Sequence, residues 1–238
     1  MPASFKTEGV VLRSIRFGEA DRVLHLYTAD RGRVGAIAKG ARRVKSRLGG
    51  RLEPLSRVRL VMHQGSGELC TIRQVDTVHA HPALRERREA LERATQACEA
   101  VLRLLDSTEP NRPAYNLLCN ELALLDASPD GACRAGALAF RLKLLLSAGF
   151  APELGSCASC GETEHLGAFS PSAGGVVCAG CEAGSFPLDE EGHRFLVEAL
   201  ARPLSERPGA SERALGQADR AIAETIEYHA HVRLRRVA

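Results

Sequence analysis

The sequence predicts an α+β fold in which a five-stranded β-barrel is followed by a helical domain. Three observations predict it. Apolar and polar residues alternate along several segments of the first 80 residues, the apolar period becomes helical from Pro82 onwards, and four cysteines form two close pairs inside the helical part. The chain of 238 residues is long enough for two domains, which we place at residues 1–81 and 82–238.

The first domain is predicted to contain five strands, because segments rich in Val, Leu and Ile are separated by short turns that contain glycine. The predicted strands span residues 9–16, 22–28, 33–39, 57–63 and 68–78. The connection between the third and fourth strands is long, at residues 40–56. Five strands with a long third connection are typical of a Greek-key barrel of the OB type. An SH3-like barrel is the structural alternative.

The second domain is predicted to be helical because apolar residues recur there every three or four positions. The predicted helices span residues 83–106, 113–126, 133–148, 188–201 and 211–236. Ser211 is placed to serve as the N-cap of the last helix.

Four cysteines are arranged as two Cys-x2-Cys pairs separated by 17 residues: Cys157 and Cys160, then Cys178 and Cys181. This spacing is typical of a tetrahedral zinc site. Two disulfides or two redox-active pairs are the alternatives. Four thiolates fill all the positions of a tetrahedron, so we predict one structural Zn²⁺ per chain, held by an element at about residues 155–185.

The sequence around these cysteines is acidic. Residues 145–192 contain seven Asp or Glu and no Lys or Arg. A zinc element that grips a nucleic acid must neutralise phosphates, and this one would repel them. We therefore expect the zinc element to stabilise the fold or to contact a protein.

The positive charge is concentrated in the predicted barrel. Residues 1–80 hold fifteen Lys or Arg and seven Asp or Glu, and residues 31–59 hold ten Lys or Arg with a single acid, Glu53. Such a local field favours a polyanionic partner. The alternative is a solvated loop that keeps the protein soluble.

The long connection is the candidate nucleic-acid contact, since the cations of residues 39–51 are closely spaced. Single-strand binders usually add aromatic side chains on which bases stack. The predicted barrel has only Phe5, Phe17 and Tyr27, and the chain has no Trp. We therefore expect binding that is mostly electrostatic, depends steeply on salt, and accepts single strands and duplexes.

Signatures of several enzyme classes are missing from the sequence. It contains no GxGxxG, HExxH or GxSxG motif, and Ala41 and Arg42 stand where a phosphate-binding loop requires Lys and Ser or Thr. We expect a protein that is not an enzyme. Without an apolar run of about 20 residues, no membrane span is expected, and the location expected is the cytoplasm.

Five blocks in the first domain resemble the RecO recombination-mediator family, in order and at the expected spacing. They are Glu8-Gly9-Val10-Val11-Leu12, Phe17-Gly18-Glu19-Ala20-Asp21, Tyr27-Thr28-Ala29-Asp30-Arg31-Gly32, Lys39-Gly40-Ala41-Arg42-Arg43 and Leu52-Glu53-Pro54-Leu55. The cysteine pairs match the members of the family that carry them. The resemblance covers essentially the whole chain.

The resemblance implies an OB domain, a helical domain with an inserted zinc element, and a non-enzymatic role in recombinational DNA repair. It implies binding of single- and double-stranded DNA and annealing of complementary strands. It also implies that the protein, with RecR and often RecF, helps RecA to replace single-stranded-DNA-binding protein (SSB), and that it is associated with the nucleoid.

The resemblance carries five DNA-binding residues over to this chain, and charge alone adds three. The five are Lys39, Arg42, Arg43, Lys45 and Arg47; the three are Arg51, Arg57 and Arg59. Two other functions stay open: an RNA-binding adaptor built on the same barrel, because phosphate contacts are common to both nucleic acids, and, less favoured, a transferase or deacylase that carries a zinc ribbon.

Overall fold

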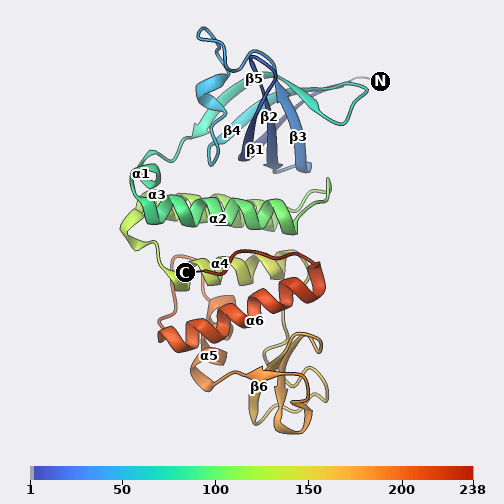
Figure 1. The fold of residues 1–238 in the computed structure, drawn as a ribbon, viewed down its shortest axis with the longest axis vertical. Helices are drawn as coiled ribbons and strands as arrows, with labels where there is room; N and C mark the ends of the chain where they lie inside the picture. Colours follow the sequence, from blue (N-terminus) through green and yellow to red (C-terminus); the bar gives the residue numbers. More distant parts are fainter. Residues whose placement is uncertain (1–2, 238) are drawn as a thin grey trace. The chain divides into compact units, whose positions relative to one another are not determined.

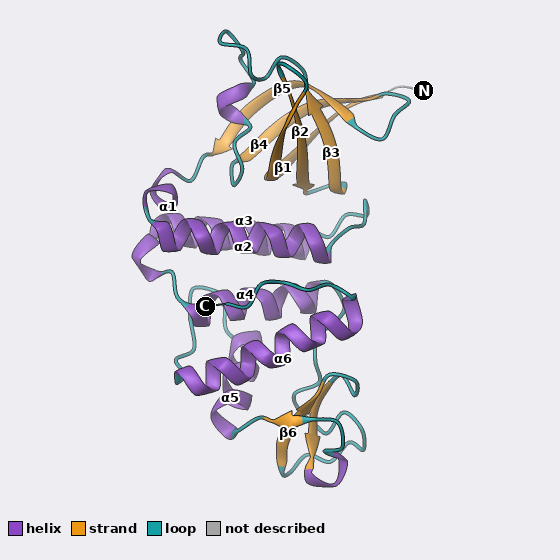
Figure 2. Cartoon of the chain, in the orientation of Figure 1, coloured by secondary structure: helices purple, strands orange, loops and turns teal. Residues whose placement is uncertain are grey.

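The computed structural model describes residues 3–237, and contacts within it divide the chain into two compact units, residues 1–131 and 132–238 (Figure 1). Each unit is described by itself. The first contains the barrel and three helices, and the second contains three further helices and a small sheet (Figure 2). No helix within residues 3–237 combines the length and the apolar character needed to cross a lipid bilayer.

Five strands form the closed barrel of the first unit. They are β1 (Ala3–Phe17), β2 (Asp21–Thr28), β3 (Gly32–Ala38), β4 (Arg57–Gln64) and β5 (Cys70–His79). They follow each other around the barrel in the order β1-β2-β3-β5-β4, and a short parallel pairing of β3 with β5 closes it. This order confirms the predicted OB-type barrel.

Alternation along each strand fills the inside of the barrel. Val58, Leu60 and Met62 of β4 are fully buried there, as their shared face predicts. On β3 the buried positions include Ala36 and Ala38, whose small side chains leave room for the larger residues of the opposite strands. Alternation thus places the strand residues of the core, and the outward positions of the strands are free to carry charge.

Three helices complete the first unit: α1 (Pro82–Glu86), α2 (Arg88–Leu104) and α3 (Arg112–Ala127). A single helix was predicted at residues 83–106, but Arg87 is extended and breaks it. Contacts outside the helix hold α1 apart from α2: the Leu84 N–H donates to Asp126 of α3 at 3.0 Å, and the Arg85 Nε donates to the Ala80 carbonyl oxygen at 2.9 Å. The expected domain boundary after residue 81 falls at the end of the barrel, whereas the compact unit extends to residue 131; as a functional boundary it stays a prediction.

The second unit consists of α4 (Arg134–Ser147), α5 (Glu190–Ala201), α6 (Glu212–Ala230) and a three-stranded antiparallel sheet. The strands β6 (Leu166–Ser170), β7 (Gly175–Cys178) and β8 (Phe186–Pro187) lie in the order β7-β6-β8. The sequence did not predict this sheet, because its strands are short and interrupted by glycines.

The ends of α6 show how side chains set helix limits. The Ser211 hydroxyl accepts a hydrogen bond from the Ala214 N–H at 3.3 Å, which confirms the predicted N-cap. The helix was expected to run to residue 236, but it ends at Ala230, where His231 adopts a left-handed conformation with φ 54°.

The segment after α6 lies over a buried carboxylate. Asp219 of α6 is only 4% exposed, and the guanidinium groups of Arg134, Arg141 and Arg236 lie 3.5–4.0 Å from its oxygens. The Val237 N–H also donates to Asp219. A buried charge is stable only when it is paired in this way, so Asp219 ties the C-terminal segment to α4 and α6.

A second ionic group joins the barrel to α3. Glu8 of β1 accepts hydrogen bonds from the Arg57 Nε at 2.6 Å and from the Tyr115 hydroxyl at 3.2 Å, and Arg59 lies 3.5 Å away. Burial alone would raise the pKa of Glu8, but these hydrogen bonds and the charges of the two arginines lower the pKa below its usual 4.5. The carboxylate therefore favours the folded state while it is ionised.

Glu8→Gln is expected to destabilise the protein by about 1–3 kcal/mol at neutral pH, because it weakens two charge-assisted hydrogen bonds. Since the folded pKa is the lower one, the contribution of Glu8 is complete above pH 4.5 and is lost as pH falls through the folded value. Urea unfolding at neutral and acidic pH should show wild type and variant converging in acid. Glu68→Gln, at an exposed acid between β4 and β5, is the control. A difference that does not change with pH would contradict this account.

Candidate nucleic-acid interface and metal centre

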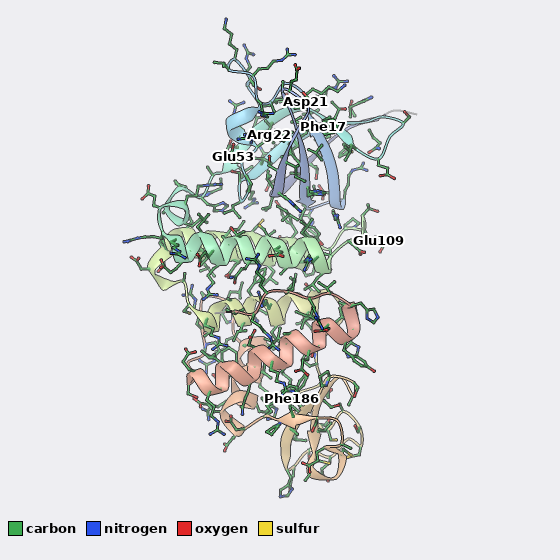
Figure 3. The ribbon with its side chains drawn as sticks, viewed as in Figure 1. Phe17, Asp21, Arg22, Glu53, Glu109 and Phe186 are labelled. Atoms are coloured by element: carbon green, nitrogen blue, oxygen red, sulfur yellow. The ribbon has the colours of Figure 1, made fainter. Side chains whose placement is uncertain are left out.

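The connection between β3 and β4, residues 39–56, begins on the hairpin that joins β1 to β2. The Gly40 N–H donates to Asp21 Oδ1 at 2.7 Å, and the Arg42 N–H donates to the Ala20 carbonyl oxygen at 2.8 Å. Figure 3 labels Phe17, Asp21 and Arg22 at this end of the barrel. These two bonds fix the first turn of the connection, so its side chains project from a defined place.

Apolar anchors hold the rest of the connection against the barrel. Ala41 is 3% exposed and Leu52 is fully buried, both within the barrel core, and Leu48 packs against them. A Cβ at Gly49 would lie 2.3 Å from the Ala41 carbonyl oxygen, so the backbone comes too close there for any side chain. The connection is therefore a folded loop with an inner apolar face.

The outer face of this loop carries the predicted cations. Six of the eight predicted DNA-binding residues lie on it, and all six are exposed: Lys39, Arg42, Arg43, Lys45, Arg47 and Arg51. We call these six residues the loop cations. Arg42 and Arg51 each donate to a backbone carbonyl oxygen, which orients them without cancelling their charge. The one acid of the loop, Glu53, is bound to Arg22 at 2.8 Å.

The other two predicted cations have a different environment. Arg57 is half-buried and bound to Glu8, and Arg59, although its side chain is 65% exposed, lies 3.5 Å from the same carboxylate. Part of their charge is thereby compensated within the barrel, and Arg57 has a structural partner. A DNA contact by either residue stays a prediction.

The sequence prediction omitted exposed cations on β1. Arg13 and Arg16 project from the second half of this strand, and the register places Arg16 opposite Arg22 of β2. They lie outside the basic run of the loop, and only the strand pairing brings them to the same end of the barrel. The signal that could have found them is their position next to the Phe17–Asp21 turn.

The four predicted cysteines come together in the second unit. Their sulfur atoms all lie within 4.8 Å of one another, and the arrangement could hold a metal ion. Cys157 and Cys160 lie on the turn before β6, Cys178 ends β7, and Cys181 ends the 3₁₀ turn Ala179–Cys181. A small core of Ala168 and Val177 supports the cluster.

The pKa values of two of these thiols are shifted in opposite directions. The backbone N–H of Cys178 lies 3.4 Å from the Cys157 sulfur and lowers the pKa of that thiol to about 6. Hydrogen bonds with Cys160 and Cys178 raise the pKa of Cys181 to about 12. Four sulfurs this close cannot all ionise unless a positive charge compensates them, and four sulfur ligands leave no open position for substrate.

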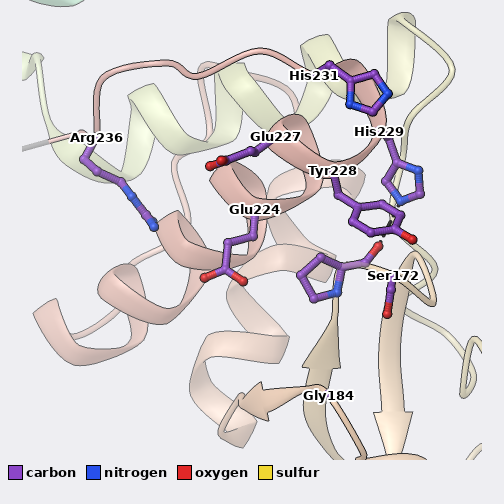
Figure 4. A pocket seen from close by; sticks show the side chains of 9 residues that line it. Ser172, Gly184, Glu224, Glu227, Tyr228, His229, His231 and Arg236 are labelled. Atoms are coloured by element: carbon purple, nitrogen blue, oxygen red, sulfur yellow. Dashed lines mark hydrogen bonds between the residues drawn. The ribbon is translucent and has the colours of Figure 1, made fainter.

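The second unit also has a surface hollow of about 1030 Å³ beside α6 (Figure 4). Glu224 and Glu227 line it together with Arg236, and Tyr228 lies at its edge. The His229 ring binds the Pro171 carbonyl oxygen at 2.9 Å. Two carboxylates against one guanidinium do not make a phosphate site, so this hollow differs in kind from the surface of the loop cations.

Two family models together match almost the whole chain. Residues 1–81 match the family model "Recombination protein O N terminal", and residues 85–237 match "Recombination protein O C terminal". A DNA repair protein RecO of Rubrobacter xylanophilus is 41% identical over 226 residues, which cover 92% of this chain and 89% of that protein. One of Anaeromyxobacter dehalogenans is 35% identical over 246 residues, covering 96% and 92%. The chain belongs to the recombination protein O (RecO) family.

Proposed function

We propose that this protein is a DNA-binding mediator of recombinational repair that acts by contacts and not by catalysis. The observation that carries the proposal is the row of six exposed loop cations on an anchored loop whose single acid is already paired. The RecO family is one of DNA repair proteins, as the names of the relatives state. The family membership supports the repair role, and the loop supplies the means of binding.

Binding of this kind is governed by counterion release. Each phosphate that a Lys or Arg neutralises releases condensed cations, which makes affinity high at low salt and tolerant of base sequence. Two strands held on one cationic surface repel each other less, so the same contacts favour annealing of complementary strands. We propose that single and double strands both bind through the loop cations.

Protein partners are proposed from the family. RecR, often together with RecF, would hold the protein at SSB-coated single strands, where it would assist the exchange of SSB for RecA. RNA remains the main competing ligand, since phosphate contacts do not separate RNA from DNA. Competition of RNA against single-stranded DNA of equal length distinguishes the two ligands. Tighter binding of RNA would favour the function of an RNA-binding adaptor.

The metal proposed for the cysteine cluster is one structural Zn²⁺, because four thiolates in two Cys-x2-Cys pairs suit its tetrahedral preference. Cys157, Cys160, Cys178 and Cys181 would hold it. The ion would supply folding free energy to a glycine-rich segment that has little core of its own.

Replacing Lys39, Arg42 and Arg43 with Ala should weaken binding to single and double strands, because three phosphate contacts are lost. The slope of log K against log salt should flatten by about one unit for each lost contact. Fluorescence anisotropy at graded salt measures both quantities. The control removes the same charge from exposed positions of the second unit, Arg194, Arg202 and Arg235. Equal slopes for wild type and the loop variant would exclude this surface.

Cys178→Ser should release the metal and lower the melting temperature by roughly 10 °C, as expected for the loss of about 2–3 kcal/mol from a unit of this size. Elemental analysis and calorimetry measure these effects, and DNA affinity should not change. Cys133→Ser, at an exposed cysteine outside the cluster, is the matched control. A Cys178→Ser protein with wild-type stability, together with a wild type that contains no zinc, would contradict the assignment.

A further inference from the structure

Strand pairing creates an apolar strip on the outside of the barrel, next to the loop cations. Ile15 of β1 is paired with Val23 of β2, and Val23 is paired with Ile37 of β3, so the three residues form one row across three strands. Their neighbours along the strands, such as Leu24 and Ala36, point into the barrel core. The row therefore faces outward.

Two further residues extend this row. Phe17 lies two residues after Ile15 on the same side of β1, and it is 55% exposed. Leu69, before β5, covers Gly35 of β3, where an added Cβ would lie 2.8 Å from the leucine side chain. We define the apolar strip as Phe17, Ile15, Val23, Ile37 and Leu69.

The strip is the uncovered part of a longer face. Further along β2, Tyr27 lies on the same side of the strand but is only 1% exposed, and α2 packs on β1 and β2. The outward side chains of β2 from His25 to Asp21 are only half-buried. The exposed apolar residues of the strip thus lie only at the end of the barrel that carries the loop.

Positive charge borders the strip on both sides. On one side, Arg13 supplies the charge of the next row, where it is paired with His25. On the other side, the pairing of Arg22 with Ala38 brings Lys39 beside Asp21, and the Arg42 guanidinium reaches the Gly18 carbonyl oxygen at 3.3 Å.

The titration of His25 agrees with a positive surrounding. Burial lowers the pKa of His25, and the charges of Arg33 and Arg13 lower it further. Three acids are near: Asp21 accepts the Gly40 N–H, and Glu19 and Glu68 are exposed. Five cations of this end of the barrel outnumber them: Arg13, Arg16, Arg33, Lys39 and Arg42.

Among the Phe and Tyr residues of the barrel that the structure describes, Phe17 is the one with a largely open ring. Tyr27 is buried, and the Arg31 guanidinium lies 3.9 Å from the centroid of Phe5, covering that ring. An apolar surface with one open aromatic ring and a cationic border complements a single strand, whose bases are unstacked and whose phosphates are charged. A duplex offers the same phosphates but keeps its bases inside.

We infer that the apolar strip contacts the bases of single-stranded nucleic acid, and that the Phe17 ring stacks on a base. The inference rests on the proposed function, since the loop cations supply the phosphate contacts. It adds a preference for single strands over duplexes that the cations cannot give. The sequence alone predicted binding that was mostly electrostatic, and the strip supplies a second contribution that salt does not screen.

The absence of tryptophan in the chain makes a direct test possible. Phe17→Trp places the only indole of the protein on the strip. Titration with oligothymidylate should quench its emission, because a stacked base quenches indole, whereas a duplex of equal length should leave it nearly unchanged. Tyr228→Trp is the matched control, since Tyr228 is 53% exposed but lies in the second unit, and its emission should not respond to either ligand.

Phe17→Ala measures the same contact by affinity. Loss of one stacked base should weaken single-strand binding by about 5- to 100-fold and leave duplex binding and both salt slopes unchanged. Phe17→Leu keeps the apolar area without an aromatic ring and should lie between wild type and the alanine variant. Melting curves check that all three variants fold, as expected for an exposed position.

The outcomes separate this inference from the proposed function. Suppose that the loop variant loses binding, but the emission of Phe17→Trp does not change when a saturating single strand is added. The strip then does not contact bases, and only this inference is overturned. Equal losses for single strands and duplexes in Phe17→Ala overturn it too. If the loop variant binds as wild type does, the proposed function itself fails.

Discussion

The capture of the β3–β4 loop by the β1–β2 hairpin is the constraint on which the nucleic-acid surface depends. A loop of this length with six exposed cations repels itself and would spread in solution. The Asp21 carboxylate holds the Gly40 N–H, and Ala41 and Leu52 are buried in the barrel core. These contacts stabilise the loop against that repulsion. The cations can therefore meet phosphates without first losing conformational freedom, which lowers the entropic cost of binding.

The two units differ in charge as well as in structure, and this difference separates their roles. The first unit holds the loop cations and fixes its barrel to α3 through Glu8, a contact between residues 107 positions apart. The second unit places its four cysteines in a segment that has no Lys or Arg. An acidic element would repel phosphates, so a metal bound by the four cysteines would stabilise the fold without competing with the loop for a nucleic acid.

The sequence predicted whatever depends on local pattern, and missed whatever depends on strand register or distant partners. Alternation and a long third connection were enough for the OB barrel, and cysteine spacing was enough to predict the cluster. The break at Arg87, the sheet of β6, β7 and β8, and the pairing of Glu8 with Tyr115 are set by tertiary contacts. The apolar strip was also missed, because its residues come from separate strands and form a row only once the register is known.

The strip and the loop cations act over different ranges, and a single-strand binder needs both. Electrostatic attraction extends over about 10 Å at 0.1 M salt and collects any nucleic acid, but it weakens as salt rises. Stacking acts only on contact and changes little with salt. A duplex cannot stack its bases on the ring, because they are already stacked on one another. Phe17 lies where the hairpin also anchors the loop, so a strand drawn in by its phosphates reaches the ring without rearrangement of the barrel. A surface with cations alone would bind duplexes and single strands with similar affinity. An exposed aromatic ring that stacks on a base raises the affinity for single strands only.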